Sequence, residues 1–381
     1  MIDYQREIEN IYSHKPVKEK IYRPVSEEGI VLYGAGKMGK MAIDLMKKKK
    51  IFPKYIIDQK AKGNIEGVEI IAPHEIPEID KQKCTFLVAI VTLPLQPIIN
   101  SLCEIGCQDV RHFYDYSQFY FPDLMSNGWE MFNLTQKIKN EIESVLNQLS
   151  HDEPSVIDYL RFLWWRLKRK DISYSDFPVL SDKKYFRADH FPDLTDEEIF
   201  VDGGAHFGYI IDEFINAVNG KFKHIFAFEP DSENISAMKE HLCLCLDEGR
   251  ITIFDTALTD INQSINFFAG LGYASKTDKN GDSLTKTVKL DDLIKIKPTI
   301  IKLHIEGDEL KALKGAKKII KKNRPILMVL ADHNKDGLYK IAKFLYNLDK
   351  YKLYFNLHDY CGNSAIFYAY PEERIYNLRK K

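Results

Sequence analysis

The chain has 381 residues, of which 45% are hydrophobic and 29% charged, as is ordinary for a globular protein of two or three domains. Lys and Arg number 54 against 55 Asp and Glu, which argues against a general affinity for nucleic acid or anionic membrane surfaces. The most apolar stretch, residues 85–99, is too short to span a bilayer and contains Pro94 and Pro97. The N-terminus has no apolar signal segment and the six cysteines form no CxxC pair, so we expect a cytoplasmic protein with reduced thiols.

Residues 1–122 alternate between strand and helix patterns. The pattern predicts strands over residues 29–36, 54–58, 84–91 and 109–116, and helices over 37–50 and 94–106. Such alternation favours a parallel sheet with helices on both faces, which is a Rossmann-like domain. Residues 123–195 carry helical periodicity over 134–149 and 155–170 and no strand pattern, so we interpret them as a helical connector.

Residues 196–381 form a second alternating block. Strands are predicted over 199–202, 224–229, 250–255, 299–304 and 325–331, and helices over 209–219, 232–246, 308–320 and 337–348. Two further apolar runs, 351–360 and 364–371, are joined by a short turn and predict a hairpin. The fold class is therefore α/β, with a doubly wound Rossmann-like sheet whose last strand is antiparallel. The polar, glycine-rich stretch 269–286 is predicted to be a loop.

Two glycine loops follow strands, and each has an acid about 20 residues further on. The first, VLYGAGKMGK at residues 31–40, contains a lysine and has no acid at its strand end. That charge suits a pyrophosphate at a helix N-terminus. The predicted nucleotide-binding residues of this domain are Gly34, Gly36, Lys37, Met38, Gly39 and Asp58.

The second loop, FVDGGAHFGY at residues 200–209, has Asp202 at its strand end. A carboxylate there repels a pyrophosphate and favours a ligand with a cationic ammonium group. S-adenosylmethionine carries such a group, and Glu229 at the next strand end suits its ribose hydroxyls. A Rossmann-like turn without a ligand stays open as the alternative.

Residues from about 196 to 371 resemble the FkbM family of S-adenosylmethionine-dependent methyltransferases. The resemblance is carried by FVDGGAHFGY, IFAFEPDSENISAMKEHL, VKLDDLI and IIKLHIEGDELKALKGAKKIIKKNRPILMV. It implies methyl transfer, most often to a hydroxyl of a sugar, glycan or secondary metabolite. The chain departs from the family's pattern at His304, where an acid is usual, and at His206, where Asn is frequent. More weakly, residues 1–122 resemble the Rossmann-like domains of sugar-modifying transferases and acyltransferases.

The expected binding residues for S-adenosylmethionine lie in the second loop and at the ends of the next two strands. They are Asp202, Gly203, Gly204, Ala205, His206, Gly208, Tyr209, Glu229, Pro230, Asp255, Thr256 and Ala257. Asp202 is expected to face the methionine amino group, and Asp255 the adenine.

Methyl transfer to a hydroxyl needs a general base or a metal ion, because a sugar hydroxyl is a very weak acid. The candidates beyond the strand ends are His304, Glu306, Asp332, His333 and, in the last hairpin, His358. His304 is the first candidate for the base, oriented by Glu306, and His333 with Asp332 is the second. The alternatives are hydrogen-bonded core histidines and a helix-capping role for Glu306. The spacing does not indicate a metal site, although a divalent ion with mixed ligands stays open.

We therefore predict an O-methyltransferase that acts on a sugar, nucleotide-linked sugar or surface glycan, as in polysaccharide biosynthesis. The first domain would hold the nucleotide end of the acceptor, or serve only in homo-oligomerisation. Two other functions stay open: an NAD-dependent sugar-modifying oxidoreductase that uses the first loop, and a non-catalytic nucleotide-binding module.

Overall fold

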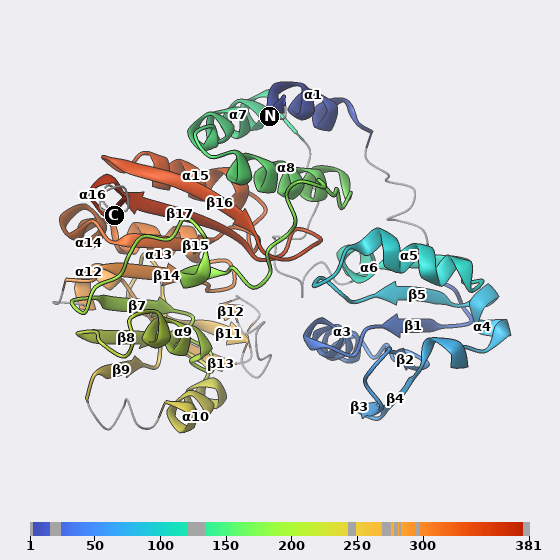
Figure 1. Ribbon diagram of the computed structural model, residues 1–381. Coiled ribbons are helices and arrows are strands. Elements are labelled where there is room, and N and C mark those ends of the chain that lie inside the picture. The colour runs from blue at the N-terminus through green and yellow to red at the C-terminus, as the bar shows by residue number, and fades with distance from the viewer. Residues whose placement is uncertain are drawn as a thin grey trace. The chain divides into compact units, whose positions relative to one another are not determined.

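The computed structural model describes residues 3–15, 24–120, 134–242, 249–268, 276–277, 281, 283–293 and 297–375. The chain divides into two compact units (Figure 1). Unit 1 comprises Met1–Asn133, Leu160–Val179 and Asp359–Asn363, and unit 2 comprises Leu134–Tyr159, Leu180–His358 and Ser364–Lys381. The two helices predicted in the connector are present as α7 (Gln136–Leu149) and α8 (Glu153–Lys168). The division between the units falls within α8.

Unit 1 is built on a sheet with the strand order β3-β4-β2-β1-β5-β6. Its neighbouring strands run parallel except β3, which pairs antiparallel with β4. The order runs outward from β1 in both directions, as in Rossmann-like sheets. The strands are β1 (Ile30–Tyr33), β2 (Ile56–Ile57), β3 (Gly63–Ile65), β4 (Val68–Ile71), β5 (Thr85–Val88) and β6 (Asp109–His112). The predicted parallel sheet is confirmed.

The helices of unit 1 agree with the prediction except at its end. They are α1 (Tyr4–Ser13), α3 (Lys37–Lys48), η1 (Pro73–Glu75), α4 (Glu78–Lys83), α5 (Leu95–Glu104) and α6 (Phe113–Tyr120). The strand predicted over 109–116 is wrong in its second half, because α6 begins at Phe113. The buried residues of α6 are Phe113, Tyr114, Tyr116 and Ser117. Their spacing is helical, but the neighbouring aromatic residues made the segment resemble a strand in the sequence.

Unit 2 is built on a seven-stranded sheet with the order β16-β17-β15-β14-β7-β8-β9 (Figure 1). Its strands from β9 to β15 pair in parallel, and β17 is antiparallel to both of its neighbours. The predicted doubly wound sheet with an antiparallel last strand is thus confirmed. The strands are β7 (Ile199–Gly203), β8 (His224–Phe228), β9 (Ile251–Phe254), β14 (Ile300–Leu303), β15 (Ile326–Leu330), β16 (Tyr351–Leu357) and β17 (Ala365–Pro371).

A smaller sheet with the order β10-β13-β11-β12 was not predicted. Its strands are β10 (Thr256–Leu258), β11 (Gln263–Phe268), β12 (Lys276–Thr277) and β13 (Ser283–Val288). The predicted loop 269–286 lies mostly outside the described residues, but its end belongs to β13. In that strand Thr285 and Thr287 are buried between exposed neighbours. Because the buried positions hold threonine, the period-two pattern is hard to recognise from the sequence.

The helices of unit 2 follow the predicted alternation. They are η3 (Tyr185–Arg187), α9 (Tyr209–Ala217), α10 (Ser232–His241), α12 (Leu290–Leu293), α13 (Glu309–Gly315), α14 (Lys317–Asn323), α15 (Gly337–Tyr346) and α16 (Glu372–Ile375). The helix predicted over 308–320 is divided at Ala316 into α13 and α14. Phe186 packs against Phe200 and Phe214, with ring centroids 5.3 and 5.4 Å away, so it is a core residue.

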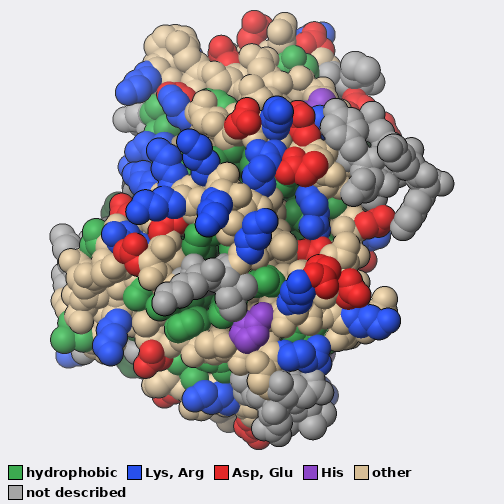
Figure 2. Space-filling view, turned by 90° about the vertical axis from the view of Figure 1, so that its left-hand side faces the viewer, with side chains coloured by type: hydrophobic (Ala, Val, Ile, Leu, Met, Phe, Trp, Pro, Cys, Tyr) green, Lys and Arg blue, Asp and Glu red, His purple; other side chains and the backbone are tan. Residues whose placement is uncertain are grey.

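Lysine and arginine side chains gather on the face of the molecule that Figure 2 shows, with aspartates and glutamates between them. On α13 and α14 the exposed lysines are Lys311, Lys314, Lys317, Lys318, Lys321 and Lys322. Among the described residues, no helix is long and apolar enough to cross a membrane.

Cys84, Cys103, Cys107 and Cys361 are free thiols, whereas Cys243 and Cys245 lie outside the described residues. Burial raises the pKa of both Cys84 and Cys107 to about 11. These two thiols are therefore protonated and unreactive at neutral pH.

Candidate active site

The second glycine loop begins where β7 ends and passes close to the end of β14. Gly204 has a φ of +74°, and a Cβ on it would lie 1.9 Å from the carbonyl oxygen of His304. His304 N in turn donates to Gly203 O at 3.0 Å. The sequence assigned these glycines to the approach of a ligand. The structure shows that Gly204 is also required for the close approach of the β14 end.

Glu229 follows β8 and is hydrogen-bonded to the loop. It accepts hydrogen bonds from His206 N at 2.8 Å, Asp231 N at 3.0 Å and Asn234 Nδ2 at 3.3 Å. Burial raises the pKa of the Glu229 carboxyl, and these hydrogen bonds oppose that shift. The predicted ribose-binding acid is thus adjacent to the predicted donor loop.

Asp202 is buried and paired with Lys302, which lies opposite it on β14. Lys302 Nζ donates to Asp202 Oδ1 at 2.6 Å and to Gly204 O at 2.8 Å. Burial raises the pKa of the Asp202 carboxyl, and Lys302 opposes that shift. Lys302 was not predicted from the sequence. The signal was a lysine inside the otherwise apolar strand IIKL, at the position that pairs with Asp202.

Asp202 Oδ2 is buried and has no hydrogen-bond partner among the residues that the structure describes. Thr256 Oγ1 is also buried without a hydrogen-bond partner among the described residues. A buried acceptor without a partner is costly unless a ligand supplies the missing donor.

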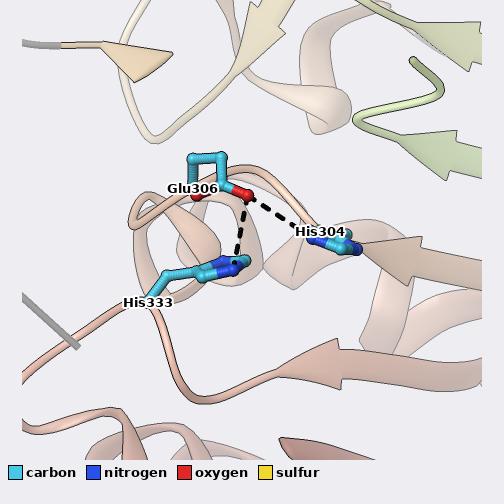
Figure 3. Close-up of side chains that lie close together, drawn as sticks. All are labelled: His304, Glu306 and His333. Carbon is cyan, nitrogen blue, oxygen red and sulfur yellow. Dashed lines mark ion pairs between the residues drawn. The ribbon is translucent and has the colours of Figure 1, made fainter. Parts of the chain in front are cut away.

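His304, Glu306 and His333 converge at the carboxyl ends of β14 and β15 (Figure 3). Glu306 Oε1 lies 3.4 Å from His304 Nε2 and 3.3 Å from His333 Nε2. One ligand atom from each of the three residues lies within 4.8 Å of the others. Glu306 has a φ of 54°, a strained conformation for a residue with a side chain and one that often occurs at functional sites. Of the predicted catalytic residues, the structure brings these three together.

Further side chains hold this cluster from outside. Tyr185 Oη and His304 Nδ1 are hydrogen-bonded at 2.9 Å. Glu309 Oε1 lies 3.0 Å from His333 Nδ1 and accepts from Ile305 N at 3.1 Å. Glu309 Oε2 accepts from Gly307 N at 3.1 Å.

The fully buried Glu309 thus binds the loop that carries Glu306, ahead of the N-cap of α13 at Asp308. Glu309 was not predicted from the sequence, since its partner His333 is 24 residues away. Tyr185 contacts His304 from η3, 119 residues earlier in the chain.

The two histidines of the cluster differ in charge. Burial, with His333 and Lys302 adding to it, lowers the pKa of His304 well below its usual range, so His304 is neutral at neutral pH. Burial also opposes the charged form of His333, but Glu306, Asp332 and Glu309 outweigh it and raise its pKa to about 10. His333 is thus charged and has no free nitrogen lone pair, whereas neutral His304 has one, which can accept a hydrogen bond from a hydroxyl or coordinate a metal ion.

Two predicted catalytic residues have other contacts. His358 is buried, with Nδ1 3.1 Å from Leu180 O and Nε2 3.0 Å from Tyr368 Oη. Burial lowers its pKa to about 4. These contacts are those of a hydrogen-bonded core histidine, the alternative that the sequence left open. Asp332 Oδ2 accepts from Ser364 N at 2.8 Å, and burial raises the pKa of Asp332.

The remaining predicted donor-binding residues lie in the loop or after β8 and β9. Gly208 is the left-handed N-cap of α9, and Tyr209 is the exposed first residue of that helix. Asp255 is exposed between β9 and β10. Ala205 follows Gly204 in the chain, Ala257 follows Thr256, and Pro230 follows Glu229.

The glycines of the first loop divide their roles as in dinucleotide-binding turns. Gly34 has a φ of +113°, and a Cβ on Gly39 would lie 2.0 Å from Gly34 O. Gly36 is the N-cap of α3 and has no atom within 4 Å of its Cβ position. Lys37 and Met38 begin α3. Asp58 accepts from Ala35 N at 2.9 Å, just as Glu229 accepts from the second loop.

Residues 202–354 match the family model described as the methyltransferase FkbM domain. These residues form an FkbM methyltransferase domain. The matched segment contains residues 202–209 of the second glycine loop, Glu229 and the three residues of Figure 3. The family implies methylation that depends on S-adenosylmethionine.

One solved structure shares the fold of the chain. The chain is similar to methyltransferase FkbM from Methylobacillus flagellatus KT, with 19% identity, a TM-score of 0.67, and coverage of 96% of this chain and 98% of that chain. It is also similar to precorrin-6y C5,15-methyltransferase from Geobacter metallireducens GS-15, with 16% identity, a TM-score of 0.30, and coverage of 46% and 82%. No curated protein matches the chain. The first likeness shows that the fold of this chain is shared over nearly its full length.

Proposed function

We propose that the FkbM domain transfers the methyl group of S-adenosylmethionine to a hydroxyl of a sugar, a nucleotide-linked sugar or a surface glycan. The observation that carries the proposal is the junction of Gly204 with His304. The loop expected to hold the donor is in backbone contact with the strand end that carries the His304 cluster. Donor and acceptor groups must be aligned for an in-line displacement, and this junction supports such an alignment.

The residues around the loop fit the donor. Glu229 is a carboxylate beside the loop backbone and suits two ribose hydroxyls. Asp202 Oδ2 and Thr256 Oγ1, which lack hydrogen-bond partners among the described residues, suit a ligand with several donor groups. S-adenosylmethionine supplies a methyl group on a sulfonium, which is an excellent leaving group.

The His304 cluster fits a hydroxyl acceptor better than an amine. A hydroxyl must lose its proton as the oxygen–methyl bond forms and the sulfur–methyl bond breaks, whereas a neutral amine attacks without prior deprotonation. His304 is neutral, and 33% of its side-chain surface is exposed. It is therefore accessible to an acceptor at the end of β14.

Calorimetric titration with S-adenosylhomocysteine tests the donor site. We expect micromolar binding to the wild-type protein and a loss of at least about tenfold in Glu229→Ala, because the ribose hydroxyls lose a charged acceptor. Glu233→Ala, at an exposed position on α10, is the matched control and should bind like the wild type. If the folded wild-type protein does not bind, the methyltransferase proposal fails.

Methyl transfer itself is measured by the mass increase of acceptors from a panel of nucleotide sugars and glycans. His304→Gln should slow transfer by about 10²- to 10⁴-fold, the range of a lost acid–base contribution. Its affinity for S-adenosylhomocysteine should stay within about threefold of wild type, because His304 is assigned to the acceptor. A variant that transfers methyl groups at the wild-type rate would remove His304 from the reaction.

We further propose that the first glycine loop binds the nucleotide end of the acceptor. The supporting observation is the open space at Gly36, at the N-terminus of α3. Gly36→Asp and Lys37→Ala should both weaken binding of a UDP-sugar. Unchanged UDP-sugar binding would contradict the proposal, and NAD in the same titration tests the oxidoreductase alternative.

A further inference from the structure

We propose that His304, Glu306 and His333 form a binding site for a divalent transition-metal ion. The site itself is argued from the geometry of these residues, and its role in methyl transfer rests on the proposed function. The sequence left open a divalent ion held by a mixed set from His304, Glu306, Asp332 and His333. Its spacing did not specify the site, because two of the ligands follow β14 and the third follows β15 (Figure 3).

Glu306 already lies at nearly the distance from both histidines that ligands of one ion have. Tetrahedral sites with ligand bonds of about 2.0–2.1 Å place neighbouring ligand atoms about 3.3–3.4 Å apart. Glu306 Oε1 lies 3.4 and 3.3 Å from the two histidine Nε2 atoms. The imidazole rings have centroids 5.0 Å apart and an interplanar angle of 34°. Small side-chain movements therefore suffice to coordinate one ion.

Each histidine is held through the nitrogen that does not face Glu306. His304 Nδ1 is hydrogen-bonded to Tyr185 Oη, and His333 Nδ1 to Glu309 Oε1. Metal-binding histidines typically donate their second N–H to a carboxylate or another oxygen, which fixes the ring and directs the lone pair at the ion. His333 carries both ring protons without an ion, so metal binding must displace its Nε2 proton. With the remaining proton of each ring on Nδ1, both Nε2 lone pairs then face Glu306.

The loop between the ligands is preorganised without an ion. Glu309 is fully buried and binds the N–H groups of Ile305 and Gly307, on either side of Glu306. Asn334 Nδ2 donates to the same carboxylate at 2.9 Å. These bonds hold Glu306 at its positive φ, so the strain of that residue is supported by a buried network.

The donor set indicates the class of metal. Two imidazoles and one carboxylate suit zinc, manganese, iron, cobalt or nickel, whereas magnesium and calcium prefer oxygen ligands alone. Three protein ligands also leave a coordination position for another oxygen, as in catalytic zinc sites. The exposed fractions of the His304 and Glu306 side chains, 33% and 13%, leave the site accessible.

The metal site changes the expected role of His304 within the proposed function. An acceptor hydroxyl at the open coordination position has a lowered pKa and releases its proton to water. The oxygen–methyl bond then forms as the sulfur–methyl bond breaks, and one proton is released per transfer. His304 is in that case a ligand and not the proton acceptor.

The test uses cobalt(II) as a spectroscopic probe on the full chain after treatment with EDTA. We expect one equivalent of Co²⁺ to bind, with visible bands typical of low coordination number. His304→Gln and Glu306→Gln should each abolish these bands. His224→Gln is the matched control, because His224 lies at the amino-terminal end of β8, whereas the cluster follows the carboxyl ends of β14 and β15, and because His224 contacts Thr252. It should bind Co²⁺ like the wild type.

Glu309→Gln tests the support of the site. It keeps the three ligands and removes the carboxylate behind His333, so Co²⁺ affinity should fall about 10- to 100-fold. Affinity for S-adenosylhomocysteine, measured on each protein, reports whether the variant has folded.

The outcomes separate the metal site from the proposed function. If the wild-type protein binds neither Co²⁺ nor Zn²⁺, or if folded His304→Gln binds them as tightly, the inference is overturned and the contacts are an ion pair between His333 and Glu306. Methyl transfer that is unaffected by EDTA would overturn the catalytic role. Normal Co²⁺ binding without binding of S-adenosylhomocysteine would support the metal site and contradict the proposed function.

Discussion

A single buried lysine, Lys302, compensates the charge of Asp202. The exposed fractions of the two side chains are 2% and 0%. Lys302→Met should lower the free energy of unfolding of unit 2 by about 3–5 kcal/mol, because it leaves the carboxylate of Asp202 without its partner in a buried site. Denaturant unfolding followed by far-UV circular dichroism measures this loss.

The double variant Asp202→Asn/Lys302→Met is the control for this charge argument. It removes both charges and should recover at least about 1 kcal/mol relative to Lys302→Met alone. If the double variant is as unstable as the single one, the loss reflects packing around Lys302 and not an unpaired charge.

These side chains also show which parts of the site the sequence could predict. His304, Glu306 and His333 were predicted because polar residues after parallel strands gather at one sheet edge. Lys302 and Glu309 were not predicted, because their roles depend on register and on distant partners. Lys302 is opposite Asp202 across two strands 100 residues apart, and Glu309 meets His333 only after β15 returns to the site.

Individual glycines of the two loops differ in how closely they are packed. Gly204→Ala should destabilise unit 2 by more than about 2 kcal/mol, because its positive φ disfavours a side chain and the new Cβ would meet His304 O. It should also abolish binding of S-adenosylhomocysteine, since the loop must shift. Circular dichroism and calorimetry measure these two effects.

The same substitution in the first loop is the matched control. Gly36 has a φ of −76° and no atom within 4 Å of its Cβ position. Gly36→Ala should therefore cost less than about 1 kcal/mol, the usual range for an N-cap change. If both alanine substitutions destabilise the protein equally, the close contact with His304 O does not explain the cost of a side chain at Gly204.

At the level of the fold, the strands and helices that have a local hydrophobic periodicity can be predicted from the sequence. Both alternating blocks were recognised because each strand or helix shows its own periodicity. Unit 1, however, also includes Asp359–Asn363, which no local pattern indicates. That segment is held in unit 1 by long-range bonds, from Tyr360 N to Val91 O at 2.7 Å and from Tyr114 Oη to Asn363 Oδ1 at 2.7 Å.

Unit 1 contains a buried histidine that makes its stability depend on pH. His112 Nδ1 accepts from Tyr114 N at 3.2 Å, and its Nε2 lies 3.3 Å from Ile90 O. The neutral ring satisfies both contacts, whereas protonation of Nδ1 breaks the first. Burial lowers the pKa of His112 to about 3, against about 6.5 in an unfolded chain. Because the folded pKa is the lower one, the unfolded chain binds protons first as the pH falls.

Acidification below pH 6.5 should therefore destabilise unit 1, by at most about 1.4 kcal/mol per pH unit from this histidine. The loss should be visible between pH 6.5 and 5, above the range in which most carboxylates titrate. Tryptophan fluorescence is the suitable probe, because the Trp165 ring lies 5.3 Å from that of His112 and the sequence of unit 2 contains no tryptophan. In His112→Gln, which cannot be protonated, the denaturation midpoint should change less over this interval. A variant with the same pH dependence as the wild type would show that other groups control the acid stability of unit 1.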